Sequence, residues 1–240
     1  MNIIKDYHTH TVYSHGLGSI EDNVKVAIEK GLKTIGISDH GYKHIGFGIK
    51  YDDIKKMKEE IDILNEKYSQ IEILLGVEAN ILDDKGNIDV DDYMLNYLDY
   101  VMAGYHFGST PTNFKSLSAH VGNYIKPFKK NFVKYNTNAV VNAMKNNDLL
   151  AITHPGSKGT VDILEVSKAS IITNTALEIN SSHSHLNMEE LKLLKDIENL
   201  KFIIGSDAHK PLDVGNFEKA IKRVKESKLD MKKIINAEVF

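Results

Sequence analysis

The sequence contains no cysteine, and only one of its 30 basic residues, Arg223, is an arginine. Without cysteine the chain has neither disulfides nor thiolate metal ligands, so any bound metal must be held by nitrogen and oxygen atoms. Arginine is the usual bidentate partner of phosphate groups. An anionic substrate must therefore be bound by lysine, histidine, backbone N–H groups or metal ions.

Long apolar runs and a strong net charge are also missing. No stretch approaches the roughly 18 apolar residues of a membrane span, and the first ten residues lack the apolar segment of a signal peptide. We therefore expect a cytoplasmic protein without a membrane partner. The formal net charge of -3 gives no sign of a nucleic-acid-binding surface. The length of 240 residues suits one large domain over residues 1–240.

Short apolar runs alternate with longer amphipathic segments along the chain. The short runs predict seven strands, at 3–7, 34–38, 71–78, 100–105, 149–153, 176–180 and 201–205. Apolar residues at three- and four-residue spacing predict helices at 20–30, 52–67, 136–147, 161–170, 187–198 and 214–226. Gly31 is the expected C-cap of the first helix. This alternation is typical of βα units and a parallel sheet.

Each expected strand ends on a polar side chain that can bind a metal or orient a ligand. In chain order these are His8 and His10, Asp39 and His40, Glu78, His106, His154, Asn180, and Asp207 with His209. Active sites of α/β proteins lie at the carboxyl ends of parallel strands. Seven strands about 4.8 Å apart span about 29 Å in an open sheet, too far for all these side chains to meet. We therefore predict a TIM-barrel-like (β/α)7 barrel, with a doubly wound open sheet as the alternative.

The histidine and carboxylate side chains at these strand ends form a candidate metal centre. Two histidines in an H-x-H pair on an extended segment point to the same side. Imidazole and carboxylate ligands suit zinc, manganese and iron. Nine candidate ligands are too many for one ion and suit two or three ions with shared bridging groups. The nine are His8, His10, His15, His40, Glu78, His106, His154, Asp207 and His209.

A structural role must be weighed for each of these residues. A single histidine at a strand end is more often a satisfied surface or core residue than a ligand, and Asp207 also suits a helix N-cap. However, seven of the eleven histidines fall at or just after expected strand ends. Glu78 follows the apolar run ILLGV, where a carboxylate without a cation is costly. Together these positions favour metal binding.

The motifs HTHTVYSH, GISDHG, GVEANI, AGYH, ITHPG and IGSDAH, in this order, resemble those of the PHP (polymerase and histidinol phosphatase) superfamily. The resemblance extends from residue 6 to about residue 217, and GVEANILDDKGNID is similar to the YcdX-like stand-alone phosphoesterases. It implies a distorted (β/α)7 barrel of the PHP fold and a trinuclear metal centre. Zinc is the metal we expect first, with manganese or iron as alternatives.

The same resemblance implies how the ligands are shared among three divalent ions. One ion is held by His8, His10, Glu78 and Asp207, a second by His15, His40 and His209, and a third by His106, His154 and a bridging Glu78. We expect hydrolysis of a small-molecule phosphate ester by a hydroxide that bridges the ions. The expected catalytic residues are His8, His10, Glu78, Asp207 and His209. Asp39 is expected either to orient His40 or to cap a turn.

Substrate-binding candidates are expected around the rim of the site. They are His44, His120, Lys158, Asn180 and Lys210, with His183 and His185 as weaker candidates. Asn180 fits a structural hydrogen bond equally well. The segment 107–135 carries five lysines and no acidic residue, and it is longer than expected for the YcdX-like branch. It has two interpretations. One is a lid that presents Lys115, His120, Lys126 or Lys129 to the substrate, and the other is a surface loop packed by Phe114, Tyr124 and Phe128.

Four other functions are alternatives to a small-molecule phosphoesterase. Histidinol-phosphate phosphatase is the specific alternative, since related PHP enzymes use the same ligand set, and an assay panel separates it from other phosphatases. The acidic net charge disfavours a nuclease. A non-catalytic, regulatory metal-binding PHP module is disfavoured by the complete ligand set. A metal-independent amidohydrolase-like barrel with a carboxylated lysine would need a lysine at a strand end, and none is found there.

Overall fold

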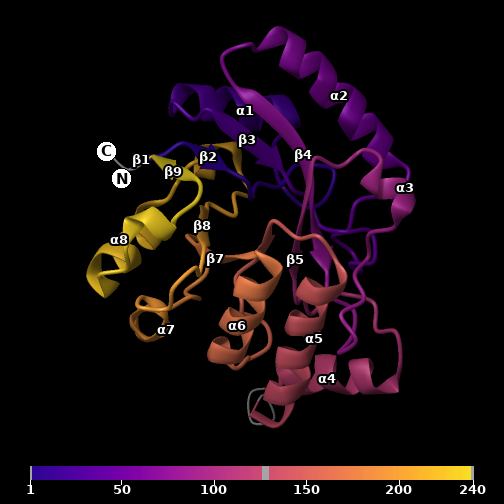
Figure 1. The fold of residues 1–240 in the computed structure, drawn as a ribbon. Helices are drawn as coiled ribbons and strands as arrows, with labels where there is room; N and C mark the ends of the chain where they lie inside the picture. The colour runs from indigo at the N-terminus through magenta and orange to yellow at the C-terminus, as the bar shows by residue number, and fades with distance from the viewer. Residues whose placement is uncertain (1, 126–129, 239–240) are drawn as a thin grey trace.

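The computed structural model describes residues 2–125 and 130–238, in which seven parallel strands form one sheet (Figure 1). The strands are β2 (Lys5–Asp6), β3 (Thr34–Ile37), β4 (Glu72–Asn80), β5 (Tyr100–Gly104), β6 (Ala151–Ile152), β7 (Ala176–Asn180) and β8 (Phe202–Gly205). Their order in the sheet is the same as their order along the chain. Each strand is therefore added beside the one before it, as in a (β/α) barrel.

The two edges of this sheet come together just beyond β2 and β8. Thr9 and Ala208 form a parallel bridge. The His10 N–H donates to the Ala208 carbonyl at 2.8 Å, and the Ala208 N–H donates to the His8 carbonyl at 3.3 Å. The sheet is thus nearly closed into a barrel, which confirms the predicted fold and excludes the open sheet.

The helices lie outside the sheet (Figure 1). They are α1 (Ile20–Glu29), α2 (Asp53–Lys67), α3 (Asp92–Leu95), α4 (Phe114–Tyr124), α5 (Val133–Asn146), α6 (Ile163–Thr173), α7 (Met188–Leu194) and α8 (Glu218–Ser227), with 3-10 turns η2 (Pro211–Asp213) and η3 (Met231–Lys233). Ser19 and Asp22 form a capping box at the start of α1, and Gly31 follows its end with a φ of +74°. Within residues 2–125 and 130–238, none of the helices has the length and apolar character that a membrane crossing requires.

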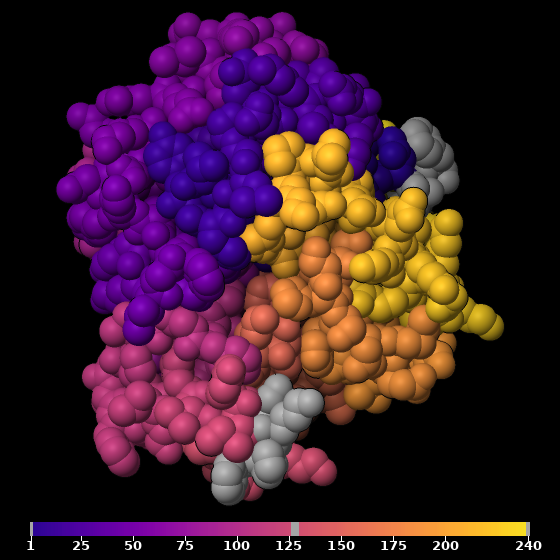
Figure 2. All heavy atoms as spheres, turned by 180° about the vertical axis from the view of Figure 1, so that it is seen from behind, coloured from indigo at the N-terminus to yellow at the C-terminus, as the bar shows by residue number. Residues whose placement is uncertain are grey.

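The expected strand at 3–7 is divided between two sheets. Its first part is β1 (Asn2–Ile3), which pairs antiparallel with β9 (Ala237–Glu238). Its second part is β2, which joins the barrel. Asn236 links both regions, because its side chain donates to the carbonyls of Lys5 and Ile204 at 2.8 Å each. The two ends of the chain therefore lie close together, and the first and last segments are neighbours on the surface (Figures 1 and 2).

Alternate residues of the strands face two different layers. In β4, Ile73, Leu75 and Val77 belong to the large apolar cluster that includes helix residues. A second, small cluster consists of Met102, Ala151, Ala176 and Ile203 and lies on the opposite strand face. Because side chains alternate with period two, Glu78 and Asn80 lie on the face that the large cluster does not use. The polar residues of the site therefore extend into the barrel interior.

Two glycines make room for an aromatic side chain in that interior. A Cβ atom at Gly36 would lie 2.0 Å from the Tyr100 hydroxyl oxygen, and one at Gly76 would lie 2.2 Å from its ring. The Tyr100 hydroxyl donates to the Tyr7 carbonyl at 2.7 Å. Tyr100 thus fills space beside β3 and β4 that strand side chains would otherwise occupy.

Candidate metal centre

A cavity of about 430 Å³ is formed by residues at and beyond the carboxyl ends of the barrel strands. Its lining residues are His15, His40, His44, Ile45, Phe47, Glu78, His106, Phe107, Gly108, His154, Lys158, His183, Asp207 and His209. His8 and His10 are fully buried and lie against Glu78 and Asp207. The structure therefore brings all nine expected ligands to one place, although their roles as ligands stay a prediction.

Glu78 is fully buried and is surrounded by imidazole rings. Its Oε1 atom lies 3.1 Å from His106 Nε2 and 2.9 Å from His154 Nε2. Its Oε2 atom lies 2.9 Å from His40 Nδ1 and 3.4 Å from His8 Nε2. The two oxygens thus face different histidines, which is the arrangement that a bridging carboxylate needs.

One oxygen each of Glu78 and Asp207 lies at a similar distance from the Nε2 atoms of His8 and His10. Asp207 Oδ1 lies 3.5 Å from His8 Nε2 and 3.3 Å from His10 Nε2, while Glu78 Oε2 lies 3.4 Å and 3.7 Å from the same two nitrogens. Two ligands about 2.1 Å from an ion at a tetrahedral angle are about 3.4 Å apart. The spacing of these four side chains therefore suits one tetrahedral ion.

Hydrogen bonds on the far side of two rings determine which nitrogen faces the carboxylates. His8 Nδ1 lies 2.7 Å from Glu178 Oε1, so it donates its proton there and Nε2 carries the lone pair. His106 Nδ1 donates to Asn80 Oδ1 at 2.9 Å, because the Asn80 amide nitrogen is already used toward Asp89 Oδ2 at 2.7 Å. Lone pairs of both rings then face carboxylate oxygens. Such a contact is stable only with a proton or a metal ion between the two acceptors.

Several buried atoms of the cluster have no hydrogen-bond partner. In the part of the chain that the structure describes, they include His8 Nε2, both ring nitrogens of His10, His15 Nδ1, His40 Nδ1 and Glu78 Oε2. Each unpaired buried polar atom costs about 1–3 kcal/mol. Nitrogen and oxygen donors of this kind bind zinc and related divalent ions. The residues present therefore fit a metal centre.

Four groups of three side chains place a ligand atom of each member within 4.8 Å of the other two. The groups are His8–His10–Asp207, His10–His40–His209, His40–Glu78–His106 and His154–His183–Asp207. His15 is adjacent, with its ring centroid 4.2 Å from that of His209 and 4.9 Å from that of His40. Because the groups share members, ions held by them would have common ligands.

The electrostatics of the cluster favour anionic carboxylates. Burial on its own raises the pKa of Glu78, but the surrounding imidazole rings hold that pKa well below its ordinary value. Asp207 is affected in the same way, with a lowered pKa. Among the rings, burial lowers the pKa of His106 to about 3, whereas at His8 burial is outweighed by Glu178, Glu78 and Asp207, which hold the pKa of that ring above its ordinary value. Anionic carboxylates are the state that metal ligation requires.

His154 and Asp207 adopt left-handed backbone conformations, with φ values of +27° and +55°. Residues with side chains rarely occupy this region, and such strain concentrates at functional sites. Both residues are at or after strand ends and both lie against other members of the cluster. Their backbone conformation is therefore a second sign that this is the functional site.

Glu178 is an important residue that the sequence analysis missed. It is fully buried, its Oε1 atom contacts His8 Nδ1, and its Oε2 atom accepts from the His154 N–H at 2.8 Å and from Asn180 Nδ2 at 3.0 Å. Glu178 is two residues before Asn180 in one strand, so strand alternation could have identified it. Asn180 also donates to Asp207 Oδ2 at 3.1 Å. Asn180 is buried and does not line the cavity, so it orients acidic side chains and does not contact a substrate there.

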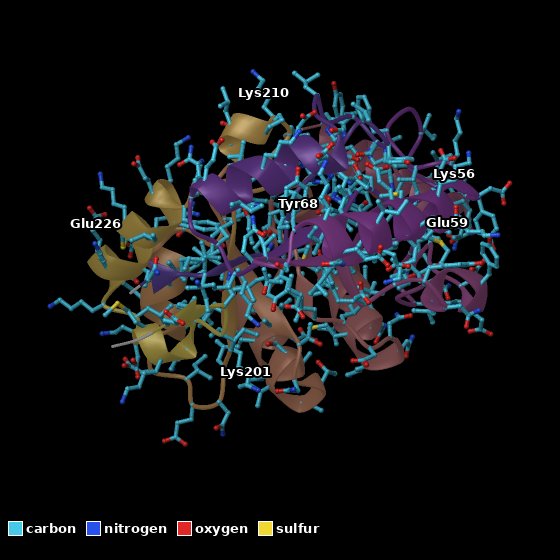
Figure 3. All side chains as sticks on the ribbon, turned by 90° about the horizontal axis from the view of Figure 1, so that it is seen from above. Lys56, Glu59, Tyr68, Lys201, Lys210 and Glu226 are labelled. Atoms are coloured by element: carbon cyan, nitrogen blue, oxygen red, sulfur yellow. The ribbon has the colours of Figure 1, made fainter. Side chains whose placement is uncertain are left out.

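Of the other substrate-binding candidates, the structure places some at the cavity and others away from it. His44 and Lys158 line the cavity. His120 does not: it is buried on α4, where its ring contacts the Ser116 carbonyl at 2.8 Å and Ser109 Oγ at 2.6 Å. Lys210 is exposed and projects from the surface (Figure 3). The expectation of direct substrate contact is therefore corrected for His120, whereas Lys210 does not line the cavity and its contact with a substrate stays a prediction.

Asp39 caps a turn, and its hydrogen bonds among the described residues go to that turn and not to the ring of His40. Its Oδ1 accepts from the Thr11 N–H at 2.7 Å, and its Oδ2 accepts from Thr11 Oγ1 at 2.6 Å. The Ser14 hydroxyl also donates to this carboxylate. Asp39 therefore stabilises the turn between His10 and His15.

Most described residues of the segment 107–135 lie away from the cavity, and only Phe107 and Gly108 line it. Lys115 is paired with Asp84 and is not presented to a substrate. The interpretation as a loop packed by aromatic side chains holds only in part for the described residues. Residues 114–124 form the helix α4, on which Phe114 is 85% exposed, but the Tyr124 ring packs against that of Phe107 with centroids 5.6 Å apart. Lys126, Phe128 and Lys129 lie outside the described residues.

Comparisons with known proteins show the family to which the chain belongs. The family model described as the PHP domain matches residues 6–236. A probable phosphatase of Thermoanaerobacter sp. (strain X514) is 33% identical over all of this chain and 92% of its own length. A probable phosphatase of Caldanaerobacter subterraneus subsp. tengcongensis is 31% identical over all of this chain and 89% of its length.

Among solved structures, the histidinol phosphate phosphatase of Lactococcus lactis, complexed with zinc, L-histidinol and phosphate, has the same fold. Its TM-score is 0.66 at 16% identity, and the match covers 94% of each chain. At this identity the likeness concerns the fold alone. The residues matched by the family model, 6–236, span the positions of all nine candidate ligands. The chain therefore belongs to the PHP domain family, as its motifs indicated.

Proposed function

We propose that this protein is a metal-dependent phosphoesterase that hydrolyses small-molecule phosphate esters at a centre of three divalent ions. The observation that carries this proposal is that Glu78 Oε2 and ring nitrogens of the histidines around it face one another without hydrogen-bond partners. The cavity beside them is large enough for a small ester and carries Lys158 on its wall. These features support binding of both cations and an anion.

The candidate ligands can be assigned to three ions. His8, His10, Glu78 and Asp207 would hold one, His15, His40 and His209 a second, and His106 and His154 with Glu78 a third. When bound, the ions supply charge that neutralises phosphoryl oxygens and acidity that yields a hydroxide nucleophile near neutral pH. Zinc is the first choice because its usual ligands in catalytic sites are histidine and carboxylate.

The chain's own residues orient the candidate ligand rings and line the cavity for a substrate. Glu178 holds the His8 ring in one tautomer, and Asn80 does the same for His106. Lys158 places a cationic side chain on the cavity wall, 6.0 Å from the centre of the Phe107 ring. Ile45 and Phe47 line the same cavity with apolar surface, which suits contact with the alcohol part of the ester. With Arg223 engaged on backbone carbonyls, phosphate recognition falls to Lys158 and the metal centre.

The curated relatives support the reaction class, since they are named probable phosphatases. The Lactococcus structure contains zinc, L-histidinol and phosphate, so histidinol phosphate is the first specific substrate to compare with other esters. A cytoplasmic location and a single domain over residues 1–240 also stay proposals.

The test compares Glu78→Gln with Glu59→Gln, an exposed carboxylate on α2 (Figure 3). Metal content and hydrolysis of 4-nitrophenyl phosphate are measured for both variants and the unmodified chain. We expect Glu78→Gln to lower the rate by about 100-fold or more, as loss of one electrostatic group in an active site does. Glu59→Gln should change neither quantity. Full activity of a folded Glu78→Gln protein would refute the proposal.

A substrate panel then separates the specific alternatives. Histidinol phosphate, sugar phosphates, nucleotides and phosphotyrosine are compared by kcat/KM. A preference of 100-fold or more for histidinol phosphate would assign that substrate. Metal binding without hydrolysis of any ester would favour the non-catalytic module instead.

A further inference from the structure

His183 lies in the cavity but is not one of the nine expected ligands. Its side chain is 32% exposed, and its Nε2 atom lies 3.4 Å from Asp207 Oδ2. Its ring centroid is 4.9 Å from that of His154. One ligand atom from each of His154, His183 and Asp207 lies within 4.8 Å of the other two. This is the ligand spacing of a shared ion.

The imidazole of His183 is held in place from several sides. The N–H of the residue donates to Asn180 Oδ1 at 2.8 Å, and its ring Nδ1 lies 3.3 Å from Ser157 Oγ. Nδ1 can therefore donate its proton to the serine oxygen, which leaves the lone pair on Nε2, on the side of Asp207. This is the tautomer and orientation that a metal-ligating histidine needs.

Arg223 holds the backbone that carries this histidine. From α8 it donates Nη1 to the His183 carbonyl at 2.8 Å and Nη2 to the Asn180 carbonyl. The planar guanidinium joins both carbonyls at once, which a lysine cannot do. Arg223 is thus a positioning residue for the turn 180–183.

The two carboxylate oxygens of Asp207 face different histidines. Its Oδ1 atom faces His8 and His10, whereas its Oδ2 atom faces His183 and accepts from Asn180 Nδ2. The distance of 3.4 Å between His183 Nε2 and Asp207 Oδ2 equals the separation of about 3.4 Å expected for two tetrahedral ligands of one ion. Asp207 can therefore bridge two ions, as Glu78 can.

We propose that His183 is a further metal ligand, which together with His154 and Asp207 holds the divalent ion that the proposed function assigns to His154. This inference rests on the metal centre of the proposed function. It adds a ligand from the turn 180–183, a part of the chain that contributes none of the nine.

The test measures zinc binding by titration and zinc content after dialysis for the unmodified chain and for His183→Ala and His183→Asn. The matched control is His185→Ala, since the side chain of His185 is similarly exposed, at 31%, and its Nδ1 lies 3.7 Å from Glu190. We expect the weakest zinc site to lose about 10- to 100-fold in affinity in both His183 variants. One zinc ion per chain should be lost on dialysis, and the control should keep its zinc.

Arg223→Lys provides a second measurement that does not alter any ligand. We expect a smaller loss of zinc affinity, because lysine can reach only one of the two carbonyls, with the far-UV spectrum unchanged. Unchanged zinc affinity in the His183 variants, or an equal loss in His185→Ala, would overturn the inference. Weaker binding of inorganic phosphate with unchanged zinc binding would also overturn it. If the unmodified chain binds no zinc, manganese or iron, the proposed function itself fails.

Discussion

At the scale of single residues, the side chains that hydrogen-bond to the candidate ligands determine what those ligands can bind. Glu178 takes the Nδ1 proton of His8, and Asn80 takes that of His106. Each ring is left with one lone pair, directed at a carboxylate oxygen. Partners of this kind fix ring orientation and tautomer in metal sites.

Glu178→Gln tests this role. A glutamine has one acceptor fewer, so it cannot both take the His8 proton and accept from the His154 N–H and Asn180. We expect metal affinity to fall about 10- to 100-fold while the fold is kept. Isothermal titration with zinc measures the effect, and Glu66→Gln, at an exposed position on α2, is the control. Equal zinc affinity of Glu178→Gln and the control would contradict the assigned role.

Residue types and strand ends were enough to predict the nine candidate ligands that the structure brings together, because parallel strands place their carboxyl ends together. They were not enough for Glu178, which lies inside a strand and was read as part of an apolar run. His120 was assigned to the rim because it follows a ligand-bearing strand. In the structure its ring is turned into the protein, toward Ser109 and Ser116, which no local pattern could have shown.

At the scale of elements, two loops form one wall of the cavity. The Ile45 N–H donates to the Gly108 carbonyl at 2.7 Å, and the Thr110 N–H donates to the Lys43 carbonyl at 2.9 Å. A Cβ atom at Gly108 would lie 2.1 Å from the His44 ring, so glycine lets the ring rest against the backbone. The loop after β3 is thereby fixed with Ile45 and Phe47 beside the candidate metal centre.

Phe47→Ala tests whether this wall contacts the leaving group. The centroids of the Phe47 and His15 rings are 4.6 Å apart, and the Phe47 side chain is half exposed. Removal of the Phe47 ring therefore leaves the core intact. We expect KM for an aryl phosphate to rise several-fold with little change in kcat, because apolar contact area is lost equally in ground and transition states. The matched control is Phe114→Ala, whose ring is 85% exposed on α4. An unchanged KM would exclude this contact.

Hydrophobic periodicity predicted the barrel strands and six of the helices, with ends that differ by a few residues. It did not predict α4, because the buried face of that helix carries Ser116, His120 and Asn123, and its large apolar residues are exposed. It also could not show that the strand at 3–7 is divided. That division depends on pairing with β9, more than 230 residues away in the sequence.

At the scale of the whole molecule, Asp6 joins the first and last parts of the barrel. Its carboxylate accepts from the N–H groups of His8 at 3.3 Å, Ser206 at 3.2 Å and Gly215 at 2.9 Å. Asp6 is fully buried, so these bonds have no competition from water. They hold the strand end that carries His8 beside the one that carries Asp207.

Asp6→Asn should therefore destabilise the barrel closure. The amide nitrogen replaces one acceptor, which leaves at least one buried N–H unpaired at a cost of about 1–3 kcal/mol. Urea unfolding followed by circular dichroism measures the change in unfolding free energy. Asp196→Asn, whose side chain is 88% exposed, should change it by less than about 0.5 kcal/mol. An Asp6→Asn protein as stable as this control would contradict the prediction.

Removal of metal should also lower global stability, since the ligands come from strand ends around the whole barrel. At a free metal concentration about 100 times Kd, one bound ion stabilises the folded state by about 2.7 kcal/mol. For a chain of this size we expect chelation to lower Tm by about 5–10 °C. Differential scanning calorimetry with and without EDTA measures the shift, and re-addition of zinc should reverse it. An identical Tm in both conditions would argue against a resident metal.

The central claim is that Glu78 and Asp207 hold divalent ions among the surrounding histidines. The most direct measurement is an anomalous difference map from crystals grown with zinc, with data on both sides of the zinc absorption edge. The account predicts peaks beside both carboxylates, within about 2.0–2.2 Å of His8 Nε2, His10 Nε2 and the carboxylate oxygens. A map without anomalous density among these side chains, in crystals that bind zinc elsewhere on the surface, would contradict it.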